Sequence, residues 1–449
     1  MVEIRDEILE AYIERTPRSK ELWDEARELI PGGTGSGFRC YDPYPTFVDR
    51  ASGSKIWDAD GNQYVDLCMS FGAAIVGHAN PKVVEAVRKQ LEKGTMYGIP
   101  HPRTALYVKE IRRRFPAMEM MRMTNSGTES TMHAIRVARA YSGKDKIVKL
   151  EGCYHGAHND ALISVHPPLG KIGPSWAPAP YIQGSGIPAN ILENVLVAPF
   201  NDVEAMERLF RKHEGEIGAL IMEPVPMNIG VILPKEGYLE AVRKLTEEHN
   251  ILLILDEVKT GCKVAPGGAT EYYGLEPDMI TLSKSIGAGF SIGAFGGRAE
   301  VMEEVSPVGR TFHGGTYNTN PVAVTAGLTG LKEVLTDDAT ARMNKLGDRL
   351  AEGVADQIED SNIKARVQHI GSAGTIYFGL TEEVLNLRMS KKVDEEAGWN
   401  FWFSLLNNGV ITPPGLMAQG EQWHLSVMHD DEDIERALEA THDALEQIR

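Results

Sequence analysis

Short apolar runs alternate with helical patterns through the middle of the chain. From about residue 81, stretches such as PKVVEAVRKQLEKG place apolar residues three and four positions apart, which is typical of one buried helix face. The apolar runs between the helices predict seven strands, at residues 121–124, 146–150, 194–198, 219–222, 252–255, 279–282 and 293–295. Several of these runs are almost wholly apolar, as in strands covered on both faces. We therefore expect a large α/β domain with a mostly parallel sheet.

The two ends of the chain have other patterns. The first thirty residues predict one amphipathic helix, which ends at the breaker cluster PGG at 31–33. Residues 46–67 predict a β-hairpin, because two β-like runs flank the turn DGN at 60–62. The last hundred residues mix helices with β-like runs such as GTIYFGL. We expect an N-terminal helix and β-rich segment at 1–75, the large α/β domain at 76–325 and a small α+β domain at 326–449.

The net charge and the cysteine content indicate which kinds of partner, metal site and cellular location to expect. The chain has 449 residues, and 46 Lys and Arg against 63 Asp and Glu give a formal charge of -17. Such a charge repels nucleic acid and anionic membranes, so we expect neither as a partner. The four cysteines lack CxxC spacing, which argues against a disulfide framework or a metal site. With no signal-like or membrane-spanning apolar stretch, we expect a soluble, cytoplasmic protein without bound metal.

A carboxylate and an amine follow two of the predicted strands. ILLILDEV places Asp256 at the end of one apolar run, and DMITLSKSIGAG places Lys284 just after another. Ligands of open α/β sheets bind beyond the carboxyl ends of strands, so both groups should face a cleft. A desolvated lysine there is a usable nucleophile. The two groups match the poles of a pyridoxal ring, whose aldehyde binds a lysine and whose ring nitrogen pairs with a carboxylate.

A phosphate site is predicted at the start of one helix. In TNSGTESTMHAIRVARAYSG, Ser126, Gly127 and Thr128 open an amphipathic pattern. Exposed backbone N–H groups and hydroxyls at a helix N-terminus bind phosphate, although an ordinary helix cap uses the same residue types. Tyr154 and His155 in EGCYHG follow another strand, where an aromatic face can stack on a planar ring.

These motifs together resemble the class III aminotransferases of the fold-type I pyridoxal-phosphate enzymes. The stretches that carry the resemblance are IWDADGN, NSGTES, EGCYHG, EPV with a following Asn, ILDEVKTG, GGATEYYG, LSKSIGAG, GAFGGR and HGGTYNTNP, spread from about residue 31 to beyond 433. Within that class the chain is most similar to the branch that contains glutamate-1-semialdehyde aminomutase and the β-amino-acid aminotransferases. The resemblance implies an α/β fold of type I with a seven-stranded sheet, flanking helices and a smaller α+β domain built from both termini.

The resemblance also implies roles for individual residues. Lys284 would hold pyridoxal 5'-phosphate as a Schiff base and shuttle protons, while Asp256 would bind the pyridine nitrogen. Val258 and Tyr154 would cover the two ring faces, with His155 beside them. The remaining cofactor-binding residues would be Ser126, Gly127 and Thr128 at the phosphate, Asn228 at the phenolic oxygen, and Thr316 reaching the phosphate from the neighbouring subunit of a homodimer.

Substrate recognition is less clearly marked. Arg39 matches the position of a carboxylate-binding arginine of the aminomutase, and Glu421 lies near an acidic pocket residue of the family. The Pro-rich segment at 162–194, which contains Trp176 and Tyr181, occupies the place of the aminomutase's small, polar lid. A more apolar lid suits a bulkier substrate.

We therefore predict an aminotransferase that moves an amino group between an amino acid or amine and a keto acid by a ping-pong mechanism. The alternative within the fold is glutamate-1-semialdehyde 2,1-aminomutase, and a racemase or epimerase would share the same motifs. A non-catalytic protein of the same fold would be expected to lack Lys284 or Asp256. A nucleotide-binding protein that uses NSGT as an anion loop is disfavoured, because neither GxGxxG after the first strand nor GxxxxGK[ST] is present.

Overall fold

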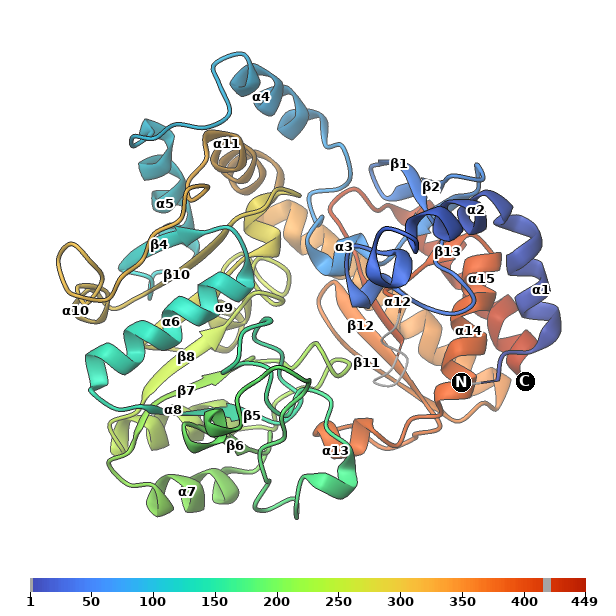
Figure 1. Ribbon diagram of the computed structural model, residues 1–449. Helices are drawn as coiled ribbons and strands as arrows, with labels where there is room; N and C mark the ends of the chain where they lie inside the picture. Colours follow the sequence, from blue (N-terminus) through green and yellow to red (C-terminus); the bar gives the residue numbers. More distant parts are fainter. Residues whose placement is uncertain (1–2, 415–420) are drawn as a thin grey trace.

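A seven-stranded sheet forms the centre of the larger part of the protein in the computed structural model, which describes residues 3–414 and 421–449 (Figure 1). Its strand order is β4-β10-β9-β8-β7-β5-β6. The strands are β4 (Met120–Thr124), β5 (Lys146–Leu150), β6 (Val195–Ala198), β7 (Ile217–Met222), β8 (Leu252–Asp256), β9 (Met279–Leu282) and β10 (Gly293–Gly297). Strand β10 is antiparallel to β4 and β9, and the other neighbours are parallel. The predicted mostly parallel sheet and its seven strands are confirmed.

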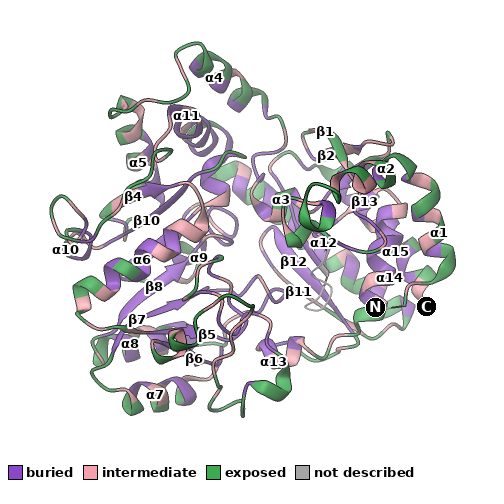
Figure 2. Ribbon diagram, in the orientation of Figure 1, coloured by how far each residue is buried: buried purple, intermediate pink, exposed green. Residues whose placement is uncertain are grey.

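Helices pack on the sheet. Those of the larger part are α4 (Pro81–Leu91), α5 (Pro102–Arg114), α6 (Gly127–Ser142), α7 (Val203–Lys212), α8 (Tyr238–Glu248), α9 (Gly268–Tyr273), α10 (Ala299–Met302) and α11 (Pro321–Thr329). Helix α6 packs across β4, β7, β8, β9 and β10. Because helices cover the sheet, all residues of β7 and β8 are buried, as the near-continuous apolar runs predicted (Figure 2).

The N-terminal region contains two helices, so the prediction of one continuous helix is wrong. Helix α1 (Asp6–Arg15) ends at Thr16, and α2 (Pro17–Ala26) begins at Pro17. Proline has no N–H to continue the helical hydrogen bonding, and its ring disfavours a helical conformation in the residue before it. Thr16 accordingly has a non-helical ψ of 40°.

The two termini build the smaller part together. The predicted hairpin is present as β2 (Lys55–Asp58) and β3 (Gln63–Asp66), with β1 (Val48–Ser52) beside β2. Strand β13 (Val410–Ile411) pairs in parallel with β3, and α1 packs on α14 (Glu395–Asn407). The described ends of the chain consequently lie near one another (Figure 1), and the Arg5 side chain donates a hydrogen bond to the Ile448 carbonyl at 3.0 Å.

A third sheet completes the smaller part. Its order is β11 (Ala365–Ile370), β12 (Ala373–Phe378) and β14 (Glu421–His424), and the helices α12 (Asp337–Ser361), α13 (Leu387–Ser390) and α15 (Asp431–Ile448) accompany it. The side chain of Glu421, a predicted substrate residue, lies outside the described part of the structure.

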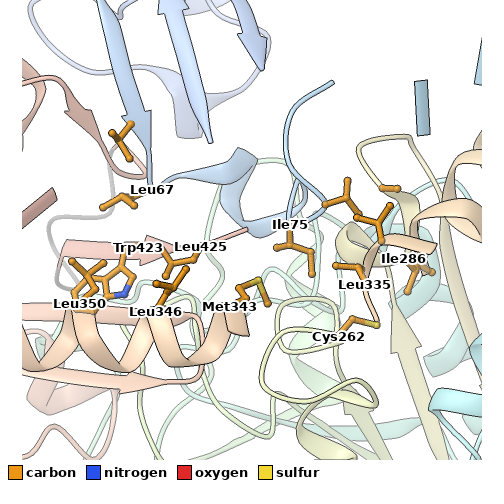
Figure 3. Close-up of a cluster of buried hydrophobic side chains, with 14 of the residues drawn as sticks. Leu67, Ile75, Cys262, Ile286, Leu335, Met343, Leu346, Leu350, Trp423 and Leu425 are labelled. Atoms are coloured by element: carbon orange, nitrogen blue, oxygen red, sulfur yellow. The ribbon is translucent and has the colours of Figure 1, made fainter. Parts of the chain in front are cut away.

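One hydrophobic core joins the two parts. Figure 3 shows Ile286, two residues after Lys284, in the same cluster as Met343 of α12 and Trp423 of β14. Burial of such side chains stabilises each by roughly 1.5–3 kcal/mol, so the cluster favours a fixed position of the smaller part against the sheet. No helix within residues 3–414 and 421–449 combines the length and apolarity needed to cross a bilayer.

We expect Asp58→Ala to destabilise the hairpin region. The buried Asp58 carboxylate accepts hydrogen bonds from the half-buried Asn62 N–H at 2.7 Å and from the buried Tyr64 hydroxyl at 2.7 Å, and its removal leaves both donors without this partner. Each unpaired donor costs about 1–3 kcal/mol, so differential scanning calorimetry should record a Tm lowered by several degrees. The exposed Asp49→Ala is the control and should leave Tm unchanged; an unaltered Tm in Asp58→Ala would contradict the assignment.

Candidate active site

A cavity of about 280 Å³ lies beyond the carboxyl ends of the parallel strands. Gly127 follows β4, Tyr154 follows β5, Glu223 follows β7, Asp256 ends β8 and Lys284 follows β9, and all five line the cavity. The carboxyl ends of parallel strands meet at one edge of a sheet, which is why residues so far apart in sequence converge there.

Asp256 is a buried carboxylate with a complete set of neighbours. It is 3% exposed, and its Oδ2 lies 2.7 Å from Nδ1 of His155. Its Oδ1 accepts hydrogen bonds from the Val258 N–H and the Thr281 hydroxyl, both at 3.0 Å. These contacts fix the orientation of the carboxylate at the cavity wall.

Lys284 reaches the same cavity in an unusual backbone conformation. Its φ is +44°, in the left-handed region that non-glycine residues rarely adopt. Such strain costs about 1–3 kcal/mol and concentrates at functional sites. Burial lowers the pKa of Lys284, while the nearby Asp256 and Glu223 raise it. Lys284 and Asp256 thus line the same cavity.

The N-terminus of α6 forms another wall. Ser126 is its N-cap and accepts a hydrogen bond from the Glu129 N–H at 3.2 Å, whereas Gly127 and Thr128 line the cavity. A Cβ on Gly127 would lie 3.0 Å from a methyl carbon of Val258, so the close approach of helix and strand favours glycine. Free N–H groups in the first turn of a helix favour an anion.

Tyr154 and Asn228 are positioned through one carboxylate. Glu223 Oε1 accepts hydrogen bonds from the Tyr154 N–H at 3.0 Å and from the Asn228 side-chain amide at 2.9 Å. The ring of Phe38 meets the ring of Tyr154 edge-on, with centroids 5.8 Å apart. Glu223 thus sets the position of two predicted cofactor residues and is itself 2% exposed.

Eight residues that line the cavity were not among the predicted site residues: Phe38, Ser70, Phe71, Thr131, Gly156, Glu223, Lys259 and Ser283. Ser70 and Phe71 have φ values of +54° and +57°, and no sequence pattern predicts this left-handed conformation at a serine and a phenylalanine. Lys259 was visible as a charged residue directly after Val258, at the end of an apolar strand. That position is the signal that could have identified it.

Several predicted residues lie elsewhere. Arg39 is exposed. Arg39, Ser126 and Thr316 are not among the described residues that line the cavity. Thr316 is exposed in the loop before α11. In the described ranges, no three His, Cys, Asp or Glu side chains are grouped as metal ligands would be.

The sequence profile described as "Aminotransferase class-III" matches residues 38–445. The chain belongs to this family. It is 42% identical to proteins named glutamate-1-semialdehyde 2,1-aminomutase from Methanocaldococcus jannaschii and Archaeoglobus fulgidus, over 96% and 95% of this chain and 98% and 99% of theirs. The predicted likeness to class III aminotransferases is confirmed, and the chain is an enzyme of this class.

Solved structures share the whole fold. An ω-transaminase from Sphaerobacter thermophilus superposes with a TM-score of 0.92 at 33% identity, covering 97% of this chain and 99% of that one. A glutamate-1-semialdehyde aminomutase from Pseudomonas aeruginosa gives 0.87 at 26% identity, covering 99% and 97%. These structures confirm the predicted fold type I architecture.

We expect His158, next to the cavity, to make the protein less stable in mild acid. Its Nε2 lies 3.2 Å from the Thr131 hydroxyl, and burial lowers its pKa to about 4. An unfolded histidine titrates near 6.5, so the unfolded state binds the proton first and stability falls as pH drops from about 6.5 towards 4.

The measurement is Tm as a function of pH between 7 and 5. His158→Gln should reduce the slope of that curve, since one such group contributes up to about 1.4 kcal/mol per pH unit in this window. His442→Gln, which alters an exposed histidine, should retain the wild-type slope. Equal slopes in all three proteins would contradict a buried neutral His158.

Proposed function

We propose that the cavity binds pyridoxal 5'-phosphate, with Lys284 as its covalent anchor. The observation that carries this proposal is that Lys284 and Asp256, from the ends of adjacent parallel strands, line one cavity. The other walls fit the same group: Tyr154 offers an aromatic face, Val258 an apolar one, and Gly127 the first turn of a helix.

Each residue then has a defined task. When bound, the cofactor supplies a protonated ring that stabilises negative charge on the carbon bearing the substrate amine. Asp256 would hold the proton on the ring nitrogen, and His155 would keep that carboxylate in place through its 2.7 Å contact. Lys284 Nζ would take the proton from the amine-bearing carbon and return it at a neighbouring position.

For the reaction itself we propose the transfer of an amino group within one molecule, as in glutamate-1-semialdehyde 2,1-aminomutase. The relatives with that name match nearly the whole chain at 42% identity, which favours this alternative over transfer between two substrates. The comparisons thus reverse the order of the two reactions predicted from the sequence.

A second candidate is transfer between an amine and a keto acid. Two observations favour it. The fold superposes on that of an ω-transaminase with a TM-score of 0.92. Arg39, which was expected to bind a substrate carboxylate in the cavity, is exposed and is not among the described residues that line it.

We also propose that the active unit is a homodimer. Phe312 and Tyr317 are 72% and 65% exposed on the loop that carries Thr316. Large apolar side chains gathered on a surface mark interaction sites. A second copy bound there would bring Thr316 to the neighbouring cavity, as the family resemblance implies.

Cofactor binding can be tested with Lys284→Ala. The purified protein, incubated with pyridoxal phosphate, should show an absorbance band in the near-ultraviolet to blue region, and borohydride reduction should fix the cofactor's mass on the peptide that contains Lys284. Lys284→Ala should lose this adduct and about 10²–10⁴-fold of the activity. Lys235→Ala, at an exposed lysine, should behave as wild type. A wild type that binds no cofactor would refute the proposal.

The choice between the two reactions depends on whether a second substrate is needed. We expect the protein loaded with pyridoxamine phosphate to convert glutamate-1-semialdehyde into 5-aminolevulinate without an acceptor, as measured by colorimetric detection of the product. Failure here, combined with turnover of an amine and pyruvate or 2-oxoglutarate, would assign the intermolecular reaction. An enantiopure amino acid that racemises without an acceptor would instead identify a racemase.

A further inference from the structure

Lys259 contributes a second amine to the cavity wall. It is 6% exposed, follows Val258 at the end of β8, and lines the same cavity as Lys284. Its Nζ donates hydrogen bonds to the Met227 carbonyl at 2.7 Å and to the Gln422 side-chain oxygen at 3.3 Å. An ammonium group has three N–H donors, so these neutral acceptors leave one donor unused.

Further cationic and polar groups are buried directly behind Lys259. Lys263, four residues further along the turn that follows β8, donates to the Lys259 carbonyl and is fully buried. A Cβ on Gly72 would lie 3.1 Å from Lys263 Nζ and 3.4 Å from His424 Cγ, so the lysine and the histidine pack against the same glycine. Both ring nitrogens of His424 and the amide nitrogen of Gln422 have no hydrogen-bond partner in the described structure.

This cluster has little negative charge to balance it. Among the side chains that the structure describes, no ion pair joins Lys259, Lys263 or Lys284 to a carboxylate. Buried charge without a counter-charge is costly, and the usual remedies are neutralisation or a bound ion of opposite sign. Glu223 raises the pKa of Lys259, but its oxygens accept hydrogen bonds from the Tyr154 and Met227 N–H groups and from the Asn228 side chain. The cavity wall at Lys259 therefore has an unused ammonium donor that no described carboxylate pairs with.

We propose that Lys259 binds an anionic oxygen of a molecule in the active-site cavity, supported by the buried cluster of Lys263, Gln422 and His424. This inference rests on the proposed function, and two oxygens have the required chemistry: the carboxylate of the substrate and the phenolic oxygen of the cofactor. Arg39 is exposed and outside the lining, so in the described cavity Lys259 is the cation that remains once Lys284 is engaged with the aldehyde.

The titration of Lys259 suits this role. Burial and the neighbouring Lys284 lower its pKa to about 7, while Glu223 and Cys68 raise it. The other groups that face it are Lys263 and His424, whose pKa values burial and the surrounding lysines also lower. Anion binding should therefore weaken as pH rises above about 7 in the unliganded protein, because Lys259 loses its proton.

The alternative for Lys259 is a tether between the loop after β7 and strand β14. A tether stabilises the fold but predicts no effect on anion affinity. Lys259→Met removes the charge and keeps an unbranched side chain, and Lys259→Gln keeps a hydrogen-bond donor without the charge. Lys391→Met, which removes a half-buried lysine outside the described cavity lining, is the matched control.

The first arm of the test uses glutarate, a dicarboxylate without an amine, as the probe. Calorimetric titration of the cofactor-loaded proteins at pH 6.5 should show glutarate affinity about tenfold weaker in Lys259→Met and Lys259→Gln, which is the effect of one charged hydrogen bond. The glutarate affinity of Lys391→Met should be unchanged.

The second arm records the visible spectrum of the loaded proteins against pH. If Lys259 binds the phenolic oxygen, both Lys259 variants should shift the midpoint of that titration and leave glutarate affinity unchanged.

The outcomes separate this inference from the proposed function. Weaker glutarate binding assigns the carboxylate, and a shifted spectral midpoint assigns the phenolic oxygen. Wild-type values in both arms for both folded Lys259 variants would overturn the inference while leaving the cofactor assignment intact. A wild type that takes up no cofactor would refute the proposed function. Glutarate titration of that unloaded protein and of its Lys259 variants would still test whether Lys259 binds an anion.

Discussion

A buried carboxylate, Asp256, and the half-buried Lys284 are held at the tips of adjacent parallel strands and face one cavity. Neither group could remain in that position without the rest of the fold. His155 and Thr281 contact the carboxylate oxygens, and all residues of β8 and β9 are buried. The site therefore depends on the parallel sheet, which brings residues from five loops to a single edge.

The smaller part of the protein is as necessary to the cavity as the sheet. Phe38, Ser70 and Phe71 come from the N-terminal region, and Gln422 of β14 accepts a hydrogen bond from Lys259. A continuous hydrophobic core holds these elements against the larger part (Figure 3). Because Ile286 and Trp423 belong to that one cluster, a movement of the smaller part would displace side chains that are packed close to Lys284.

The charge distribution around the cavity distinguishes its two ends. Asp256 with His155 forms the carboxylate side, while Lys284, Lys259 and Lys263 form a cationic side without an ion-paired acid among the described side chains. A ligand with a cationic ring nitrogen and anionic oxygens would complement both sides. Burial lowers the pKa of each of these lysines, and the neighbouring lysines lower the pKa values of Lys259 and Lys263 further.

The sequence by itself determined the seven strands, the α/β class and the central pair of the site. Continuous apolar runs such as ILLIL have few alternatives to a covered strand, and a polar residue at their end must face a ligand or a partner. The spacing of residues could not place Arg39, Ser70 or Lys259 relative to the cavity. Their positions depend on left-handed turns, on the packing of the N-terminal region against β14, and on the break at Pro17. Contacts between segments hundreds of residues apart leave no period in the chain, so only the tertiary structure decided them.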